Sequence, residues 1–329
     1  MICAVLLLGL AAGRPAEADP AVVRIVVPID LAALPLLVAA HDRLIEKLAE
    51  ARAIPVTVQW LTPNGGNPLD QLASGQADIV ATTDIAAFIA AWDAHSGAPT
   101  EIRGLAGLAR MPYLLLSRNP AIATIRDFSA KDRIAVPALK LSVPAIMLEM
   151  AAVDEWGAAH YDRLDPLTVA RGSQEADTAL HAGKGDIDAD FSRAPYANDE
   201  RADPTIHRVM DSFDIAGPHS VSAVVTTAQF RDANPTLCAA VVDALTGADA
   251  SIREHRGSAA EIFVDAAKDQ GFAVEELSDM LGDPDTSFDP APAGIQRLVA
   301  FMHQIGRIQH NPDSWQQLFF PEIYKLPGS

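Results

Sequence analysis

Hydrophobic and polar positions follow one another in a pattern typical of strands separated by amphipathic helices. The first block predicts a strand at 22–28, a helix at 35–50 and a second strand at 54–61. The stretch 69–88 then combines a short helix, a turn at Gly75, a short apolar strand and the start of another helix. Regular alternation of strands and helices predicts a mostly parallel sheet with helices on both faces.

The middle of the chain partly repeats this pattern. Strands are predicted at 102–108, 113–117, 133–136 and 167–171, and helices at 144–156 and 173–182. Ala182-Gly183 followed by an Asp-Ile strand repeats Ser74-Gly75 followed by Asp78-Ile79, so we expect two similar α/β lobes. The segment 209–225 indicates a strand, a crossing loop and a second strand. The rest of the chain is rich in helix patterns, at 235–255, 259–271, 274–281, 293–305 and 314–319.

Composition and charge narrow the class of protein. The 329 residues are 49% hydrophobic, which suffices for one or two domains with apolar cores. There are 43 acidic and 25 basic residues, and the net charge is -18. Because nucleic-acid binding needs a basic surface, we expect no nucleic-acid partner.

The first residues resemble a secretory signal peptide. Residues 2–12 form an apolar run too short to span a bilayer, and Ala16-Glu17-Ala18 is a typical cleavage site. No Lys or Arg precedes the run, which leaves the true start codon open. We expect a signal peptide over 1–18, cleavage near Ala18 and an exported protein. Removal of Cys3 leaves Cys238 alone, so the mature chain would hold no intramolecular disulfide.

Polar groups follow the strands predicted in the first part of the chain. The carboxyl ends of parallel strands meet at one edge of a sheet, where ligands bind, so we expect a binding site there. Its candidate ligand-binding residues are Asp30, Leu31, Asn64, Gly65, Gly66, Thr82, Thr83 and Asp84. The glycines would bring backbone N–H groups close to an anion, or form a plain turn. Two carboxylates, Asp30 and Asp84, would suit an amine, an amidine or a pyrimidine N–H, or would cap backbone N–H groups locally.

A second set of candidates follows the strands of the repeated part. These residues are Lys140, Ser142, Phe191, Ser192, Arg193 and His219. Lys140 would supply a positive charge for a sulfonate or carboxylate, or be a solvated loop residue. Ser142 precedes a helix as a cap or anion donor, and Arg193 would hold an oxyanion. Phe191 would stack on a flat ligand, and His219 would touch the ligand or be held by backbone bonds in a crossing loop.

Motifs for catalysis and metal binding are missing from the sequence. The histidines show no H-x-x-x-H or H-E-x-x-H spacing, and there is no G-x-S-x-G elbow or phosphate loop. Asp186, Asp188 and Asp190 share one face of a strand, but their spacing is not that of a calcium loop. We therefore expect no catalytic residues, no metal site and no cofactor.

Several motifs resemble those of the type II periplasmic solute-binding proteins of ABC importers. The resemblance is to the nitrate, sulfonate and taurine group, which also includes binders of thiamine pyrimidine precursors. The motifs are 24–28 (RIVVP), 71–79 (QLASGQADI), 125–128 with 131–136, and 182–190. The usual Gly before Ile134 is absent, and the turn at 138–142 contains Leu and Lys where relatives often carry Gly-Ser.

This resemblance implies a two-lobed α/β fold with a ligand closed in the cleft between the lobes. Lobe one would comprise 19–109 plus 218–329, and lobe two 112–213, with hinges near 108–113 and 213–221. We expect a monomer that binds one small polar solute and delivers it to the membrane permease of the importer. An aminosulfonate or alkanesulfonate is the favoured ligand; nitrate, a carboxylate and a pyrimidine remain open. Alternatives are an enzyme on the same fold, related to pyrimidine synthesis, and the ligand-sensing domain of a signalling system.

Overall fold

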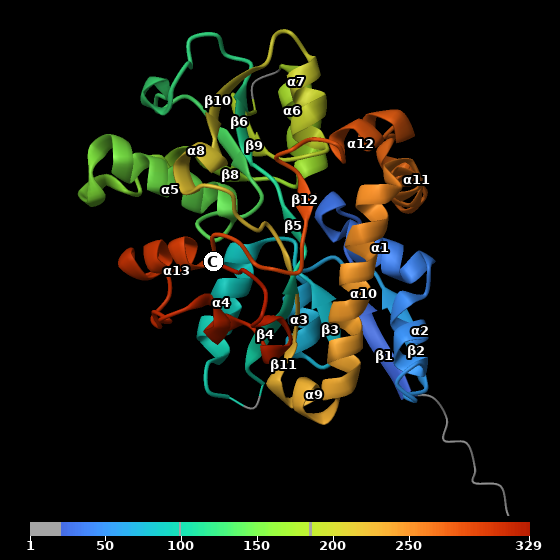
Figure 1. The fold of residues 1–329 in the computed structure, drawn as a ribbon. Helices are drawn as coiled ribbons and strands as arrows, with labels where there is room; N and C mark the ends of the chain where they lie inside the picture. Colours follow the sequence, from blue (N-terminus) through green and yellow to red (C-terminus); the bar gives the residue numbers. More distant parts are fainter. Residues whose placement is uncertain (1–20, 99, 184–185) are drawn as a thin grey trace, which may run out of the picture.

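The computed structural model describes residues 21–98, 100–183 and 186–329. Two five-stranded sheets, each flanked by helices, form two lobes that lie one above the other in Figure 1. The expected signal peptide and its cleavage site lie outside the described residues. None of the helices in the described ranges is long and apolar enough to cross a membrane.

The sheet of the first lobe has the strand order β2-β1-β3-β11-β4. The strands are β1 (Ala21–Val26), β2 (Val56–Leu61), β3 (Ile79–Ala81), β4 (Ile102–Gly107) and β11 (Ala223–Thr227). β1 is parallel to β2 and β3, whereas β11 is antiparallel to β3 and β4. The flanking helices are α1 (Leu34–His41), α2 (Leu44–Glu50), α3 (Pro68–Ala73), α4 (Ile85–His95), α9 (Ala228–Ala233) and α10 (Pro235–Glu254).

The sheet of the second lobe repeats this arrangement, with the order β10-β6-β9-β7-β8. The strands are β6 (Leu114–Ser117), β7 (Ile134–Val136), β8 (Thr168–Ala170), β9 (Ala189–Ser192) and β10 (His207–Asp211). β7 is parallel to β8 and β9, and β6 is antiparallel to β9 and β10. The helices are α5 (Val143–Trp156), α6 (Ser173–Ala182), α7 (Tyr196–Ala202) and α8 (Ser212–Ala216). In each of these two sheets, four of the five strands therefore run in the same direction, and only β11 or β6 runs against them. The mostly parallel sheets predicted from the sequence are confirmed.

The remaining elements complete the first lobe and the connection between the lobes. They are α11 (Arg256–Ala266), α12 (Val274–Met280), α13 (Ile295–Gln304) and two short strands, β5 (Ala109–Arg110) and β12 (Ser287–Phe288). Short 3₁₀ helices occur at Leu31–Ala33, Ile125–Asp127, Ala158–His160, Asp165–Leu167, Lys268–Gln270, Trp315–Leu318 and Pro321–Ile323. β5 pairs with β12, and Arg110 forms a bridge with Ser220. The crossing segment that contains β5 is therefore hydrogen-bonded to the C-terminal part of the chain, through β12, and to the other crossing segment, through Ser220.

One helix prediction and one loop prediction were wrong in detail. The helix predicted at 35–50 is divided into α1 and α2, because Arg43 adopts a left-handed conformation with φ of 53°. A left-handed residue cannot continue a right-handed helix. The loop predicted between the strands of 209–225 contains a short helix, α8, which Asp211 begins by accepting a hydrogen bond from the Phe213 N–H.

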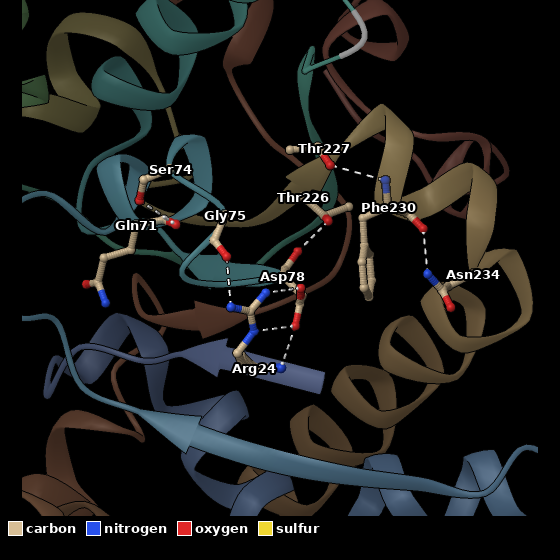
Figure 2. A network of polar contacts seen from close by, with 9 residues as sticks. All are labelled: Arg24, Gln71, Ser74, Gly75, Asp78, Thr226, Thr227, Phe230 and Asn234. Carbon is tan, nitrogen blue, oxygen red and sulfur yellow. Dashed lines mark hydrogen bonds and ion pairs between the residues drawn. The ribbon is translucent and has the colours of Figure 1, made fainter. Parts of the chain in front are cut away.

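Figure 2 shows how Asp78 fastens the turn before β3 to strand β1. The Asp78 carboxylate accepts hydrogen bonds from the backbone N–H of Arg24 (2.8 Å) and from its Nε (3.0 Å) and Nη2 (2.7 Å). Arg24 Nη1 also donates to the Gly75 carbonyl (2.8 Å), and Thr226 Oγ1 donates to the Asp78 carbonyl (2.6 Å). Arg24, Gly75 and Asp78, which belong to the motifs at 24–28 and 71–79, thus position the strands that lead to the edge of the sheet.

The second lobe contains the same arrangement around Asp188. Its carboxylate accepts from the Arg133 N–H (2.8 Å), its own N–H donates to the Arg133 carbonyl (2.8 Å), and Ser117 Oγ donates to its carbonyl (2.7 Å). Asp78 likewise donates its N–H to the Arg24 carbonyl (2.9 Å). The internal repeat is therefore real, but the equivalent of Asp78 is Asp188 rather than Asp186, the aspartate of the repeated Asp-Ile pair.

Candidate functional site

A cavity of about 590 Å³ lies between the lobes, where the loops after the parallel strands of the two sheets face each other. The first lobe contributes loops that follow β1, β2 and β3, and the second contributes loops that follow β7, β8 and β9. Nine of the residues predicted from the sequence line it: Asp30, Gly65, Gly66, Thr83, Asp84, Ser142, Phe191, Ser192 and Arg193. The topology thus brings candidates from both lobes to one place.

Three candidates of the first lobe lie outside this lining. Leu31 is buried against the core and borders a smaller neighbouring cavity of about 200 Å³. Asn64 bonds to the side chain of Gln76 (3.3 Å) on the exposed side of its loop. Thr82 is buried, and its hydroxyl accepts the Ala223 N–H (3.0 Å) of the neighbouring strand. In this structure these three side chains contact neighbouring parts of the first lobe and do not line the larger cavity.

Lys140 and His219 also lie outside the lining. The Lys140 side chain is 60% exposed, and its Nζ lies 3.7 Å from a carboxylate oxygen of Asp165. His219 is fully buried; its ring nitrogens lie 3.0 Å from Ser212 Oγ and 3.3 Å from the Ser220 carbonyl. Burial lowers the pKa of His219 to about 4, so the ring is neutral at physiological pH. This is the arrangement of a histidine held within a crossing segment.

Asp84 connects the lobes at the wall of the cavity. Its Oδ1 caps α4 by accepting the Ala86 N–H (2.8 Å), as the sequence suggested. Its Oδ2 accepts the Val143 N–H (2.9 Å), the first residue of α5 in the other lobe. Asp84 is 7% exposed, and burial raises its pKa to about 6, although the hydrogen bonds from Val143 and Ala86 oppose this rise.

Arg193 forms the second connection between the lobes. Its Nη2 lies 2.5 Å from Oδ2 of Asp30, while Oδ1 of Asp30 accepts the Ala32 N–H (2.8 Å). Arg193 Nε donates to the Tyr113 hydroxyl (3.1 Å), and the guanidinium lies over the Tyr113 ring, 5.6 Å from its centre. Burial alone would lower the pKa of Arg193, but Asp30 and Tyr113 raise it above its ordinary value, so the cation persists.

Tyr113, Arg171 and Asp190 also line the cavity, although none of them was predicted from the sequence as a ligand-binding residue. Tyr113 lies in the crossing segment before β6, and no local signal in the sequence points to it. Arg171 follows β8, so its place after a strand was the available signal. Its guanidinium is already paired with Glu175 (2.5 Å) and Asp186 (3.4 Å).

Asp190 of the cavity wall forms a buried pair of carboxyl groups with Glu200, which lies outside the lining. Burial raises the pKa of Asp190 to about 7, and burial together with Asp190 raises that of Glu200 to about 10. Ser192 Oγ donates to Glu200 Oε2 (2.7 Å). Two buried carboxyl groups that interact hold a shared proton near neutral pH, so the pair carries about one negative charge or none.

One group of side chains in the described ranges has the ligand types for a metal ion. The ligand atoms of Asp177, His181 and Asp199 lie within 4.8 Å of one another. These residues come from α6 and α7 and lie outside the cavity lining. The pKa of Asp177 is raised to about 6, chiefly by burial; His181 opposes this rise and Asp199 contributes to it.

Several solved structures share this architecture across almost the whole chain. The aliphatic sulphonate-binding protein SsuA of Escherichia coli has a TM-score of 0.67 and 19% identity, covering 92% of this chain and 98% of that one. The alkanesulfonate-binding SsuA of Xanthomonas axonopodis pv. citri, bound to MOPS, has a TM-score of 0.67 and 18% identity, covering 90% and 96%. The nitrate-binding protein NrtA of Synechocystis PCC 6803 has a TM-score of 0.68 and 13% identity, covering 92% and 87%.

The sequence itself matches no protein-family model and no curated protein. Identities below 20% with the solved structures show a shared fold and leave the ligand open. These solved structures are periplasmic solute-binding proteins, the class of protein whose motifs this sequence resembles. The chain therefore has the two-lobed α/β fold of the periplasmic binding proteins.

Proposed function

We propose that this chain is the periplasmic substrate-binding component of an ABC importer. The observation that carries the proposal is that charged groups from both lobes meet at one cavity, through Asp30 with Arg193 and Asp84 with the Val143 N–H. Contacts of this kind hold two lobes closed over a solute and separate when they open. The protein would act as an exported monomer, bind one solute per chain without covalent chemistry, and present its closed form to the membrane permease.

The lobes that move would be those expected from the sequence. Lobe one comprises 19–109 plus 218–329 and lobe two 112–213, and the hinges lie near 108–113 and 213–221. The bridge between Arg110 and Ser220 supports a hinge in this region, because it joins the two crossing segments, and the pairing of β5 with β12 joins one of them to the C-terminal part of the chain.

For the ligand we propose an organic sulfonate, either an aminosulfonate or an alkanesulfonate. The cavity, at about 590 Å³, has room for much more than a small inorganic anion such as nitrate. Its walls include apolar groups, among them Ala87, Leu141 and Phe191, which suit a carbon chain. Two of the structural relatives are described as binding sulfonates, and one holds MOPS, which carries both a sulfonate and an amine.

A thermal-shift screen of the mature protein tests this function. The panel contains alkanesulfonates, taurine, nitrate, carboxylates and pyrimidines, with the mass of each compound measured after incubation. A solute at a hundred times its Kd should stabilise the folded protein by roughly 2.7 kcal/mol. A hit that is unchanged in mass, and that Arg193→Ala abolishes, supports a transport receptor. Turnover of a compound, or no response to any of them, would contradict the proposal.

A further inference from the structure

We propose that Asp30 and Asp84 compete internally with oxyanions, so that the cleft selects solutes carrying a cationic nitrogen together with an oxyanion. This inference rests on the proposed function and decides between its two ligand classes. It favours an aminosulfonate over a plain alkanesulfonate. The anion-binding groups of the cavity already direct hydrogen bonds to acceptors of the protein itself.

The first of these groups is the guanidinium of Arg193. Its side chain is only 10% exposed, and its donors already face Asp30 (Nη2, 2.5 Å) and the Tyr113 hydroxyl (Nε, 3.1 Å). Nη1 lies 3.7 Å from the Met111 sulfur. A carboxylate of the protein thus occupies the position on Arg193 that a ligand oxyanion would take.

The second group is the N-terminus of α5, which faces the cavity at Ser142. The N–H of Val143 donates to Asp84 (2.9 Å), and Pro144 has no N–H. The N–H of Ala145 points to Ser142 Oγ at 3.4 Å, and the N–H of Ile146 donates to the Ser142 carbonyl (3.0 Å). Helix N-termini bind anions through such donors, but in this helix the protein's own acceptors use them.

A bare oxyanion would therefore have to displace one of these carboxylates. The displaced group would remain in a poorly solvated wall, since Asp84 is 7% exposed and the Asp30 side chain 21% exposed. An unpaired charge in such a place is unfavourable. A ligand with an ammonium group removes this difficulty, because its cation pairs with the displaced carboxylate while its oxyanion takes the vacated donor.

The three charged groups that take part in this exchange, Asp30, Asp84 and Arg193, share one neighbour, Tyr113. Burial raises the pKa of Tyr113, whose ring lies beside Arg193, and the charges of Asp84 and Asp30 raise it while that of Arg193 lowers it. All three charged groups therefore act on one wall of the cavity. The other lining cation, Arg171, is already paired with Glu175 and Asp186.

The test compares two solutes that differ only in an amine: propanesulfonate and homotaurine, its terminal amine derivative. Their Kd values are measured by calorimetry at pH 7.5 for the full mature chain and for Asp30→Asn and Asp84→Asn. Asn keeps the helix cap in both variants but removes the negative charge. Asp232→Asn is the control, because Asp232 lies in α9 with its side chain 72% exposed and outside the cavity lining.

We expect the wild-type chain to prefer homotaurine by at least about tenfold, as losing one charge-assisted contact predicts. Each cleft variant should move the ratio of the two Kd values toward propanesulfonate by about tenfold, and the control should leave it unchanged. A wild-type chain that binds both probes equally, or variants that keep its ratio, would overturn the inference.

The variants decide the inference even if wild-type protein binds neither probe. Gained affinity for propanesulfonate in Asp30→Asn or Asp84→Asn would support internal competition, and no gain would overturn it. The receptor role is judged separately by the thermal-shift panel. A panel hit of any class with unaltered ratios in the variants would leave the receptor role standing and remove only the inference.

Discussion

An ion pair away from the cavity should control how firmly the lobes close. Glu149 of α5, in the second lobe, is 1% exposed and pairs with Arg307, which follows α13 in the first lobe. Neither residue lines the cavity. The pKa of Glu149 is raised to about 7, chiefly by burial; Asp165 contributes to this rise, whereas Arg307 and Lys140 oppose it.

Replacing Arg307 with Gln removes the partner of this buried carboxyl group. Removing one member of a buried, hydrogen-bonded charge pair costs about 2–5 kcal/mol. Glu149 titrates near neutral pH and can take up a proton when its partner is lost, so we expect a smaller effect, about 1–2 kcal/mol. This cost falls on the closed form, because opening exposes Glu149 to water. The apparent affinity for the solute should then fall by about tenfold.

Calorimetric titration of wild-type and Arg307→Gln protein with the solute identified by the screen measures this effect. Arg297→Gln makes the same charge change at an exposed position of α13 and should bind like the wild type. Glu149→Gln combined with Arg307→Gln should regain part of the lost affinity, since no buried charge is left unpaired. Unchanged affinity in a folded Arg307→Gln variant would refute the reasoning.

Three further predictions concern the stability and chemistry of the first lobe. Asp249 is 3% exposed and its pKa is raised to about 8, first by burial. Because the folded state holds this proton more tightly, the stability that it contributes is full below about pH 4 and is lost as the pH rises through 8, so Asp249→Asn should raise Tm at pH 9 and flatten its fall from pH 5. A Cβ at Gly104 would lie 2.2 Å from the Phe319 ring, so Gly104→Ala should lower the free energy of unfolding by roughly 2 kcal/mol in urea; an unchanged midpoint would contradict this contact. Cys238 is buried and its pKa is raised to about 12, chiefly by burial, so a thiol reagent should modify it only at the rate of unfolding.

Features with a local cause were predictable from the sequence. The caps formed by Asp84 and Ser142 follow from a short polar side chain before a helix, and each accepts a backbone N–H as expected. The positions after strands also identified nine of the residues that line the cavity, because parallel strands bring their carboxyl ends together.

Features that depend on distant residues were not predictable. Asp30 and Arg193 are 163 positions apart, and Asp84 and Val143 are 59 apart, so no local pattern indicates either pairing. Both aspartates cap backbone N–H groups locally, which is one of the two roles expected from the sequence, and they also reach the other lobe, which was not expected. Tyr113 was missed because its role depends on the path of the crossing segment.

The measurement that tests the account most directly is the distance between the lobes during titration with the solute. Spin labels on Thr57→Cys in β2 and Thr178→Cys in α6 occupy exposed positions, and the native Cys238 is buried and should remain unlabelled. The account predicts that the distance distribution becomes shorter and narrower on binding and saturates at one solute per chain. Binding that leaves the distribution unchanged would contradict closure of the lobes over the ligand.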